Sequence, residues 1–187
     1  MLGRTTSIPN YVVAALIILR APVSAATTLE QLRTRWFGVA LIVIGLDQLS
    51  KNAANKLLDL YQPVPVTSFF NWTLAYNEGA AFSFLSDAGG WQRWLFVGLA
   101  LSISLFLVLR IRTLTRAQAL EAWALSLILG GAIGNVIDRL VFGHVIDFVQ
   151  LHYQDWYWPA FNVADSAISV GVVLLIVDVM RGNPDSP

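Results

Sequence analysis

The chain of 187 residues contains no cysteine and few charged residues. The absence of cysteine excludes disulfide bonds, thiolate metal sites and a cysteine nucleophile. Charged residues make up 13% of the chain, whereas a soluble domain usually carries about 25%. Hydrophobic residues make up 56%, and the mean hydropathy is +0.62. This composition indicates an integral membrane protein.

Histidine is scarce, and the charges balance. The two histidines, His144 and His152, are too few for a histidine-rich metal site, and lone histidines of this kind are most often polar loop residues or interface anchors. The formal net charge is zero, so nothing indicates a nucleic-acid partner.

Four stretches are long and apolar enough to cross a membrane as helices. They cover about residues 36–55, 91–109, 117–137 and 160–179, and the tryptophans fall mostly near their ends, as interfacial aromatic residues do. Residues 59–90 are too polar and too broken to span, but apolar residues alternate loosely there and predict a short strand or hairpin lying on the membrane. We therefore predict an all-α integral membrane protein with four transmembrane helices. A small β-containing extracytoplasmic segment separates helices 1 and 2.

Lysine and arginine are distributed unevenly about these spans. Eight of them precede the first span, lie between the second and third, or follow the fourth, against four on the other side. The positive-inside rule then places both termini in the cytoplasm, with residues 56–90 and 138–159 outside. We expect residues 182–187 to be a cytoplasmic tail. Residues 1–32 are expected to be a cytoplasmic extension or an over-extended start, since their apolar stretch is short for a cleaved secretory signal.

Two aspartates flank the last outer loop, Asp147 before it and Asp165 after it. A carboxylate beside hydrocarbon is costly, so each is a candidate functional residue. A short loop can bring them together, and a close carboxylate pair tends to keep one proton. One acid, one base and a water between them is the chemistry of an aspartic protease.

Other polar residues gather on the same side of the membrane. On the third helix, Asn135, Asp138 and Arg139 share one face. We read Asp138 and Arg139 as an interfacial ion pair in which Asp138 orients Arg139 or a backbone group. Arg139 is the stronger functional candidate, because a guanidinium offers five donors. Small residues one turn earlier permit close helix packing, namely Gly130, Gly131 and Gly134.

The remaining candidates have both structural and functional readings. Asn162 can cap the fourth helix, and Asp165 suits a first helical turn. Asp47 and Lys51 are spaced as a buried ion pair, which either neutralises a costly charge or braces the site from behind. In the turn after the predicted hairpin, Asn77 and Gly79 can fold over the acids. From these residues alone, a protease, a small proton-coupled transporter and a structural scaffold all stay open. A transporter needs polar groups through the whole membrane, whereas the second and fourth spans are nearly uniformly apolar.

Five motifs occur in order along the chain. They are Asp47-Gln48-Leu49-Ser50-Lys51, Asn77-Glu78-Gly79-Ala80-Ala81-Phe82, Gly130-Gly131-Ala132-Ile133-Gly134-Asn135-Val136-Ile137-Asp138-Arg139, Val145-Ile146-Asp147-Phe148 and Phe161-Asn162-Val163-Ala164-Asp165-Ser166. A four-span chain with these motifs resembles the lipoprotein signal peptidases, the bacterial type II signal peptidases of the aspartic peptidase class. The resemblance covers about residues 36–180 and leaves the N-terminal extension without a counterpart.

The resemblance implies a role for each candidate. Asp147 and Asp165 are the implied catalytic pair, and Asp138 is not part of it. The implied substrate-binding residues are Asn77, Gly79, Asn135, Arg139 and Asn162, and the implied supports of the site are Asp47, Lys51 and Asp138.

The substrates of that family are prolipoproteins whose cysteine already carries a diacylglycerol, and the enzyme cuts just before this cysteine. We accordingly expect a monomeric enzyme of the bacterial inner membrane with its active site at the outer face. Its expected partners are these prolipoproteins and membrane lipid, and no cofactor or metal is needed.

Overall fold

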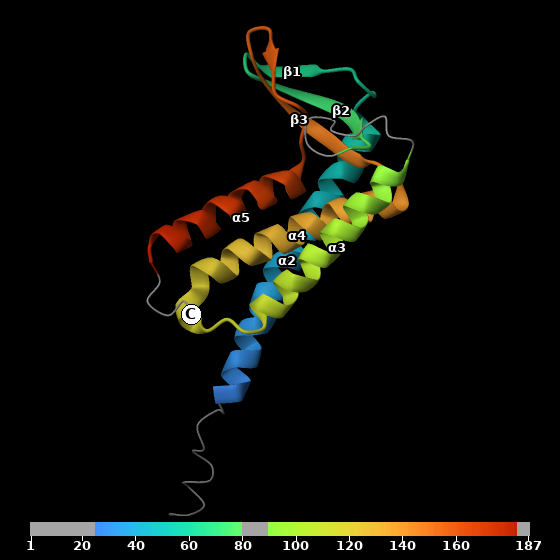
Figure 1. Ribbon diagram of the computed structural model, residues 1–187. Coiled ribbons are helices and arrows are strands. Elements are labelled where there is room, and N and C mark those ends of the chain that lie inside the picture. The colour runs from blue at the N-terminus through green and yellow to red at the C-terminus, as the bar shows by residue number, and fades with distance from the viewer. Residues whose placement is uncertain (1–24, 80–89, 183–187) are drawn as a thin grey trace, which may run out of the picture.

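The computed structural model describes residues 25–79 and 90–182, with side chains from residue 34 onward. Within these ranges four long helices form a bundle, and four strands form an antiparallel sheet at one end of it, here called the sheet end (Figure 1). Parts of three predicted segments lie outside the described residues: the extension up to residue 24, positions 80–89 of the outer segment, and the tail from residue 183.

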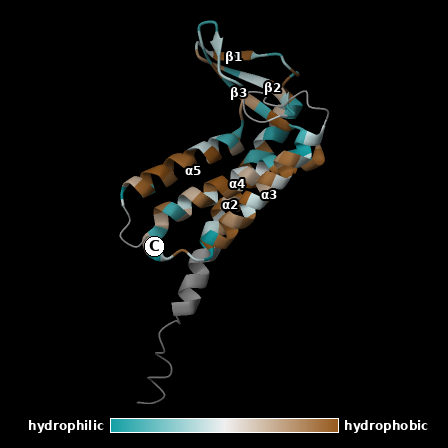
Figure 2. Ribbon diagram, viewed as in Figure 1, coloured by the Kyte–Doolittle hydropathy of each residue, from teal (hydrophilic) through white to brown (hydrophobic). Residues whose placement is uncertain are grey.

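The first helix, α2, spans Ala25–Leu57 and is longer than the predicted span. The helix starts earlier because the preceding stretch contains Ala, Leu, Glu, Gln and Arg, which favour helix. This stretch is not apolar, so the prediction of a membrane span did not include it. Residues 25–32 of the predicted extension are therefore the first turns of this helix. Near the sheet end, hydrophilic residues of α2 replace its apolar ones (Figure 2).

The other helices follow the predicted spans closely. They are α3 at Trp91–Ile111, α4 at Ala119–Val141, preceded by the short 3-10 helix η2 at Arg116–Gln118, and α5 at Val163–Met180. Among the described residues, three helical segments have the length and apolar composition to cross a membrane: Trp91–Ile111, Arg116–Val141 and Val163–Met180. The helix α2 does not meet this measure, because Asp47, Lys51 and their polar neighbours interrupt its apolar stretch.

The end of α4 differs from the prediction. We expected the third span to end near residue 137 and the outer loop to begin at 138, but the helix continues to Val141. Among the residues that follow, Arg139 and Leu140 favour helix, and no Gly or Pro ends the helix before Gly143. Asp138 and Arg139 therefore lie on the last helical turns, where a helix fixes their spacing.

The sheet corrects the predicted fold class, because it is larger than expected and the chain is not all-α. The strands β1 (Val64–Thr67) and β2 (Phe70–Asn77) form the predicted hairpin. The loop between the last two helices adds β3 (Val145–Tyr153) and β4 (Trp156–Tyr157), which we did not predict. The order is β1-β2-β3-β4, so strands far apart in sequence pair at the centre. We missed β3 because its first four residues are all buried. A strand is recognised in a sequence by apolar and polar residues that alternate, and a strand buried on both faces lacks this pattern.

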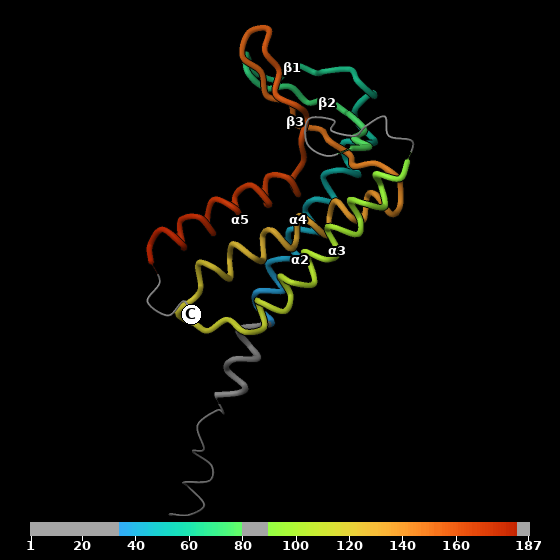
Figure 3. Tube along the Cα trace, viewed as in Figure 1, coloured from blue at the N-terminus to red at the C-terminus, as the bar shows by residue number. Residues whose placement is uncertain are grey.

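The last connection returns the chain to β3 before α5 begins. The N–H groups of Phe148 and Val149 donate to the carbonyl oxygen of Phe161, and the N–H of Phe161 donates to that of Val149. These bonds bring the start of α5 beside the middle of β3, as the path of the chain in Figure 3 shows. Two segments separated by a hairpin in the sequence thus meet at the sheet end.

The helix α4 packs against α2, α3 and α5 and lies at the centre of the bundle (Figure 1). Its glycines permit this packing, as predicted. A Cβ on Gly130 would lie 2.7 Å from Val43 Cβ on α2, and one on Gly131 would collide with the carbonyl oxygen of Ala164 on α5. With no Cβ at either position, the polar residues at the sheet end of three helices can approach one another.

Candidate active site

The structure brings Asp147 and Asp165 to the same place. Asp147 lies on β3 with 2% of its surface exposed, and Asp165 lies half-buried in the first turn of α5. Asn162 joins them: its side-chain Nδ2 donates to Asp147 Oδ1 over 2.7 Å, and its backbone N–H donates to Asp165 Oδ2 over 3.3 Å. Two carboxylates that share one hydrogen-bonding residue are close enough to influence each other's ionisation.

Asn162 also begins α5, as predicted. It is the N-cap, with its Oδ1 accepting from the N–H of Asp165 over 2.9 Å. The reciprocal bond from the Asn162 N–H to Asp165 completes a capping box. The cap therefore fixes the side chain of Asp165 and that of Asn162 together.

Strand pairing supplies a second donor to Asp147. In the register of β2 and β3, Ala75 faces Asp147, so Asn77, two residues further, lies on the same face of the sheet. Asn77 Nδ2 donates to Asp147 Oδ2 over 3.2 Å. Both carboxylate oxygens of Asp147 thus have an amide donor.

The surroundings of Asp147 make its ionisation unusual. Burial, followed by the nearby charge of Asp165, raises the pKa of Asp147 from 3.8 to about 7. The amides of Asn77 and Asn162 and the cation of Lys51 oppose this rise. A carboxyl group that holds a proton near neutral pH beside a second carboxyl group is suited to general acid–base catalysis.

Asn135, on α4, connects the pair to the residues behind it. Its Nδ2 donates to Asp165 Oδ1 over 2.8 Å. Its Oδ1 accepts from Lys51 Nζ over 2.9 Å and from Asn162 Nδ2 over 3.3 Å. Because one end donates and the other accepts, the network fixes the orientation of this amide.

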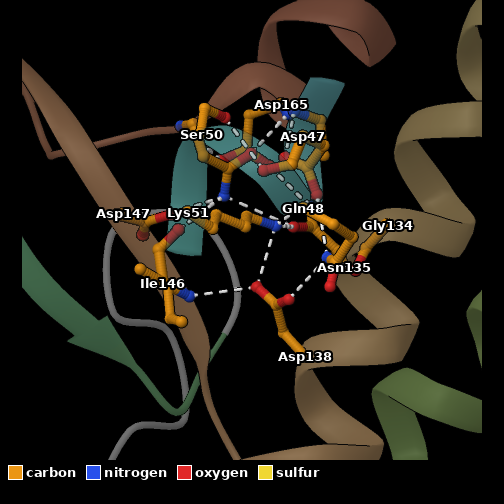
Figure 4. Close-up of polar contacts among 12 residues, drawn as sticks. Asp47, Gln48, Ser50, Lys51, Gly134, Asn135, Asp138, Ile146, Asp147 and Asp165 are labelled. Atoms are coloured by element: carbon orange, nitrogen blue, oxygen red, sulfur yellow. Dashed lines mark hydrogen bonds and ion pairs between the residues drawn. The ribbon is translucent and has the colours of Figure 1, made fainter. Parts of the chain in front are cut away.

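Behind the pair lies a buried cluster of charges. Lys51 Nζ is 2.8 Å from Asp47 Oδ2 and 2.8 Å from Asp138 Oδ2, and these three residues have at most 1% of their surface exposed (Figure 4). The predicted Asp47–Lys51 pair is confirmed. The predicted pairing of Asp138 with Arg139 is wrong, since adjacent residues on a helix point in different directions and Asp138 faces Lys51 across the helix interface. Asp138 does orient a backbone group, accepting from the N–H of Ile146 over 3.2 Å.

Comparisons with known proteins show the family to which the chain belongs. The profile of a family described as signal peptidase (SPase) II matches residues 39–181. The chain belongs to the signal peptidase II family. That family consists of aspartic peptidases, and the matched stretch contains all the site residues described above.

Curated relatives of the family match most of this chain. A lipoprotein signal peptidase of Teredinibacter turnerae is 53% identical over 148 residues, which cover 79% of this chain and 88% of the relative. One of Paraburkholderia phytofirmans is 56% identical over 146 residues, covering 78% and 84%. A solved bacterial membrane enzyme has a TM-score of 0.72 and 28% identity, covering 82% of this chain and 92% of its own. The chain is therefore a bacterial membrane enzyme.

Within this signal peptidase II framework, Arg139 lies where the turn after β2 reaches the helices. Its Nη2 donates to the carbonyl oxygen of Gly79 over 2.8 Å, and its guanidinium lies 5.3 Å from the centre of the Phe96 ring. The N–H of Gly79 donates to Asn77 Oδ1 over 3.1 Å. Arg139 Nε is buried and has no hydrogen-bond acceptor among the described residues.

Sequence reasoning missed one residue of the site, Gln48. Its Nε2 lies 2.8 Å from Asp138 Oδ1, 3.2 Å from Asp47 Oδ2 and 3.2 Å from the carbonyl oxygen of Gly134. Gln48 stands in the first motif, between two residues that we did single out, and that position was the available signal. In the described part of the chain, no three His, Cys, Asp or Glu residues are arranged to hold a metal ion.

Proposed function

We propose that this member of the signal peptidase II family cuts diacylglyceryl-modified prolipoproteins just before the modified cysteine, with Asp147 and Asp165 as its catalytic pair. The family assignment supports the removal of signal peptides from prolipoproteins. The observation that carries the choice of the pair is the bridge through Asn162, which binds one oxygen of each carboxylate. We leave Asp138 out of the proposed pair because it is fully buried and its carboxylate forms a 2.8 Å ion pair with Lys51, whereas Asn162 contacts Asp147 and Asp165.

The proposed mechanism uses one water and one proton shared by the pair. The ionised carboxylate takes a proton from the water, whose oxygen attacks the scissile carbonyl carbon. The protonated carboxyl group donates to the developing oxyanion, and a proton passes to the amine as the C–N bond breaks. General acid–base catalysis of this kind contributes about 10²–10⁴-fold. The two acids titrate as a unit, so the proton belongs to the pair.

Arg139, Gly79 and Asn77 are the proposed binding residues on the sheet side of the pair. Among the described residues the buried Nε of Arg139 has no acceptor, and a peptide carbonyl of the substrate is the acceptor that we propose for it. The amides of Asn135 and Asn162 hold the acids in place and face the same site.

We further propose that α2 is a fourth membrane span and that the sheet end faces outward. Its apolar residues before Asp47 extend the length of the bundle, and Asp47 and Lys51 are buried against α4 and α5 rather than exposed to lipid. The distribution of Lys and Arg supports cytoplasmic termini. The scissile bond of a membrane-tethered substrate then lies at the depth of the pair. The proposed working form is a monomer.

The test is cleavage of a purified diacylglyceryl-modified prolipoprotein by the purified full chain in detergent. We expect cleavage just before the modified cysteine and little cleavage of the same substrate without lipid. Absence of cleavage by a well-folded preparation would contradict the proposal and favour the transporter reading, which proton flux in liposomes then examines.

A further inference from the structure

The buried cluster touches the backbone at two points, and each point adjoins a catalytic acid. Asp47 Oδ1 accepts from the N–H of Ala164 over 2.9 Å, and Ala164 immediately precedes Asp165. Asp138 Oδ2 accepts from the N–H of Ile146 over 3.2 Å, and Ile146 immediately precedes Asp147. Two carboxylates from different helices thus hold the two chain segments that carry the pair.

Lys51 connects these two carboxylates. Its ammonium lies 2.8 Å from an oxygen of Asp47, 2.8 Å from one of Asp138 and 2.9 Å from Asn135 Oδ1, so its three hydrogens have three acceptors (Figure 4). The third acceptor leads to the pair, because Asn135 donates to Asp165. Gln48 adds a neutral bridge between the same two carboxylates.

Electrostatics explains why a cation is needed at this point. Asp47 and Asp138 have 0% of their surface exposed, so no water screens the repulsion between them. A lysine between them converts this repulsion into two attractions and brings α2 and α4 together at a fixed distance. The segments that they hold are then fixed as well.

We propose that Lys51 is a positioning residue for the reaction: by holding Asp47 and Asp138 together, it sets the separation of the segments that carry Asp165 and Asp147. This inference rests on the proposed catalytic pair and extends it to the residues behind. It differs from a purely structural role, in which an ion pair stabilises the fold and leaves catalysis unchanged once the protein is folded.

Among the described residues, three charged groups face Asp147 and influence its pKa. The pH–activity profile is therefore a readout that a change in stability alone does not move. The three groups are Asp165 on α5, Lys51 on α2 and Arg139 on α4. The cation of Lys51 lowers the pKa of Asp147, so its removal raises that pKa and moves the alkaline limb of the pH–activity profile to higher pH.

The experiment compares the full-length wild type with Lys51→Met, which keeps the unbranched shape of the side chain, one atom shorter, and removes its charge. Because this variant leaves two buried carboxylates unpaired, the double variant Asp47→Asn/Lys51→Met accompanies it and keeps the net charge of the cluster. The matched control is Arg110→Met, which breaks an ion pair between α3 and α4 in which Arg110 Nε lies 2.6 Å from Glu121 Oε1. Asp147→Asn is included to test the catalytic pair separately.

We expect kcat to fall by about tenfold to a hundredfold in Lys51→Met and in the double variant, with KM changed by less than about threefold. The alkaline limb moves up in Lys51→Met, and Arg110→Met changes only the thermal midpoint. Wild-type kcat and limb in either inserted Lys51 variant would overturn the proposal, as would failure of both variants to insert. Full activity of Asp147→Asn would instead remove the catalytic pair, whatever Lys51 does.

Discussion

The side-chain amide of Asn162 donates to Asp147 Oδ1 over 2.7 Å, so the residue that caps α5 also holds the buried acid on β3. A helix cap and an active-site contact are here the same side chain. The two tasks need different chemistry, because capping uses the Oδ1 acceptor and the contact with Asp147 uses the Nδ2 donor. Substitution can separate them.

Asn162→Ser is expected to keep the cap and lose the contact, whereas Asn162→Ala loses both. Serine caps helices about as well as asparagine. The serine variant should therefore be more stable than the alanine variant by about 1 kcal/mol in the free energy of unfolding, and it should unfold at a higher temperature. Both should show the same lowered kcat, about tenfold or more, because alanine has no donor and serine has a shorter side chain without the Nδ2 that reaches Asp147. Thermal unfolding and cleavage rates measure the two effects. Recovery of activity in the serine variant would show that only the cap matters.

Asp147→Asn and Asp165→Asn are each expected to give an inserted and inactive protein. Asparagine keeps the shape of the side chain but neither takes a proton from water nor donates one to an oxyanion as an acid, so cleavage should fall by about 10²–10⁴-fold or more. The control is Asp178→Asn. It makes the same chemical change as Asp165→Asn on the same helix, but at the other end of α5. Retained cleavage by either of the first two variants would remove that residue from the catalytic pair.

The pH–activity profile should fall on its alkaline side from about pH 7, since burial and Asp165 raise the pKa of Asp147 to about 7. Above that value the pair loses the proton that it shares, and kcat/KM is expected to decrease about tenfold per pH unit. A profile that stays flat to about pH 9 would be inconsistent with this shared proton.

The same titration changes stability in a direction that checks the assignment. Between pH 3.8 and about 7 the folded protein holds on the pair a proton that the unfolded chain has released, so stability decreases as pH rises through this window. The change is on the order of a few kcal/mol. Asp147→Asn should lack this decrease, so the thermal midpoints of the two proteins should differ more at pH 8 than at pH 4.

Arg139→Ala is expected to weaken binding of the lipidated substrate more than it disturbs insertion. The fold-increase in KM should exceed the fold-decrease in the yield of inserted protein. Its guanidinium holds the Gly79 carbonyl and presents a buried Nε with no acceptor among the described residues, so its loss removes donors from the substrate side of the site. The control is Arg93→Ala, because Arg93 also lies near the sheet end and also has a buried Nε without an acceptor among the described residues, but its Nη2 donates to the Leu140 carbonyl and not to the turn after β2. Wild-type affinity of Arg139→Ala for a diacylated peptide would contradict this role.

Sequence reasoning located the acids, the caps and the close helix contacts because each leaves a local trace. Asn162 precedes an apolar run with Asp165 three residues later, which is the pattern of a capped helix. Asp47 and Lys51 are one helical turn apart, so their pairing needs no knowledge of other helices. In both cases a short stretch of chain contains all the partners.

The contacts that were missed or misread join distant segments. Asp138 has an arginine beside it in the sequence, yet its partner is Lys51 on another helix. The place of Gln48 in the first motif was its one signal and did not reveal its partners, because its acceptors on α4 are set by helix packing. The strand β3 was read as a loop because its buried start pairs with β2, about seventy residues earlier, and such pairing is not encoded in either strand by itself.

Glycine to alanine substitutions on α4 should lower activity according to what the new methyl group meets. On Gly134 a Cβ would lie 2.6 Å from Asp47 Oδ2, and on Gly131 it would collide with the Ala164 carbonyl, next to Asp165. Either collision displaces a residue that holds the pair, so we expect destabilisation of about 1–3 kcal/mol and a fall in kcat. Gly98→Ala on α3 is the control, because a Cβ there meets nothing within 4 Å.

Gly98→Ala also separates the effect of a close helix contact from the effect of helix propensity. Alanine favours helix over glycine by about 1 kcal/mol, so Gly98→Ala should be neutral or slightly stabilising, with unchanged kcat. The same gain is available at Gly134, and only the contact with Asp47 opposes it. If Gly134→Ala is as stable and as active as Gly98→Ala, then α2 and α4 are not in close contact at Gly134. In that case Asp47 cannot lie both 2.8 Å from Lys51 Nζ and 2.9 Å from the backbone nitrogen of Ala164.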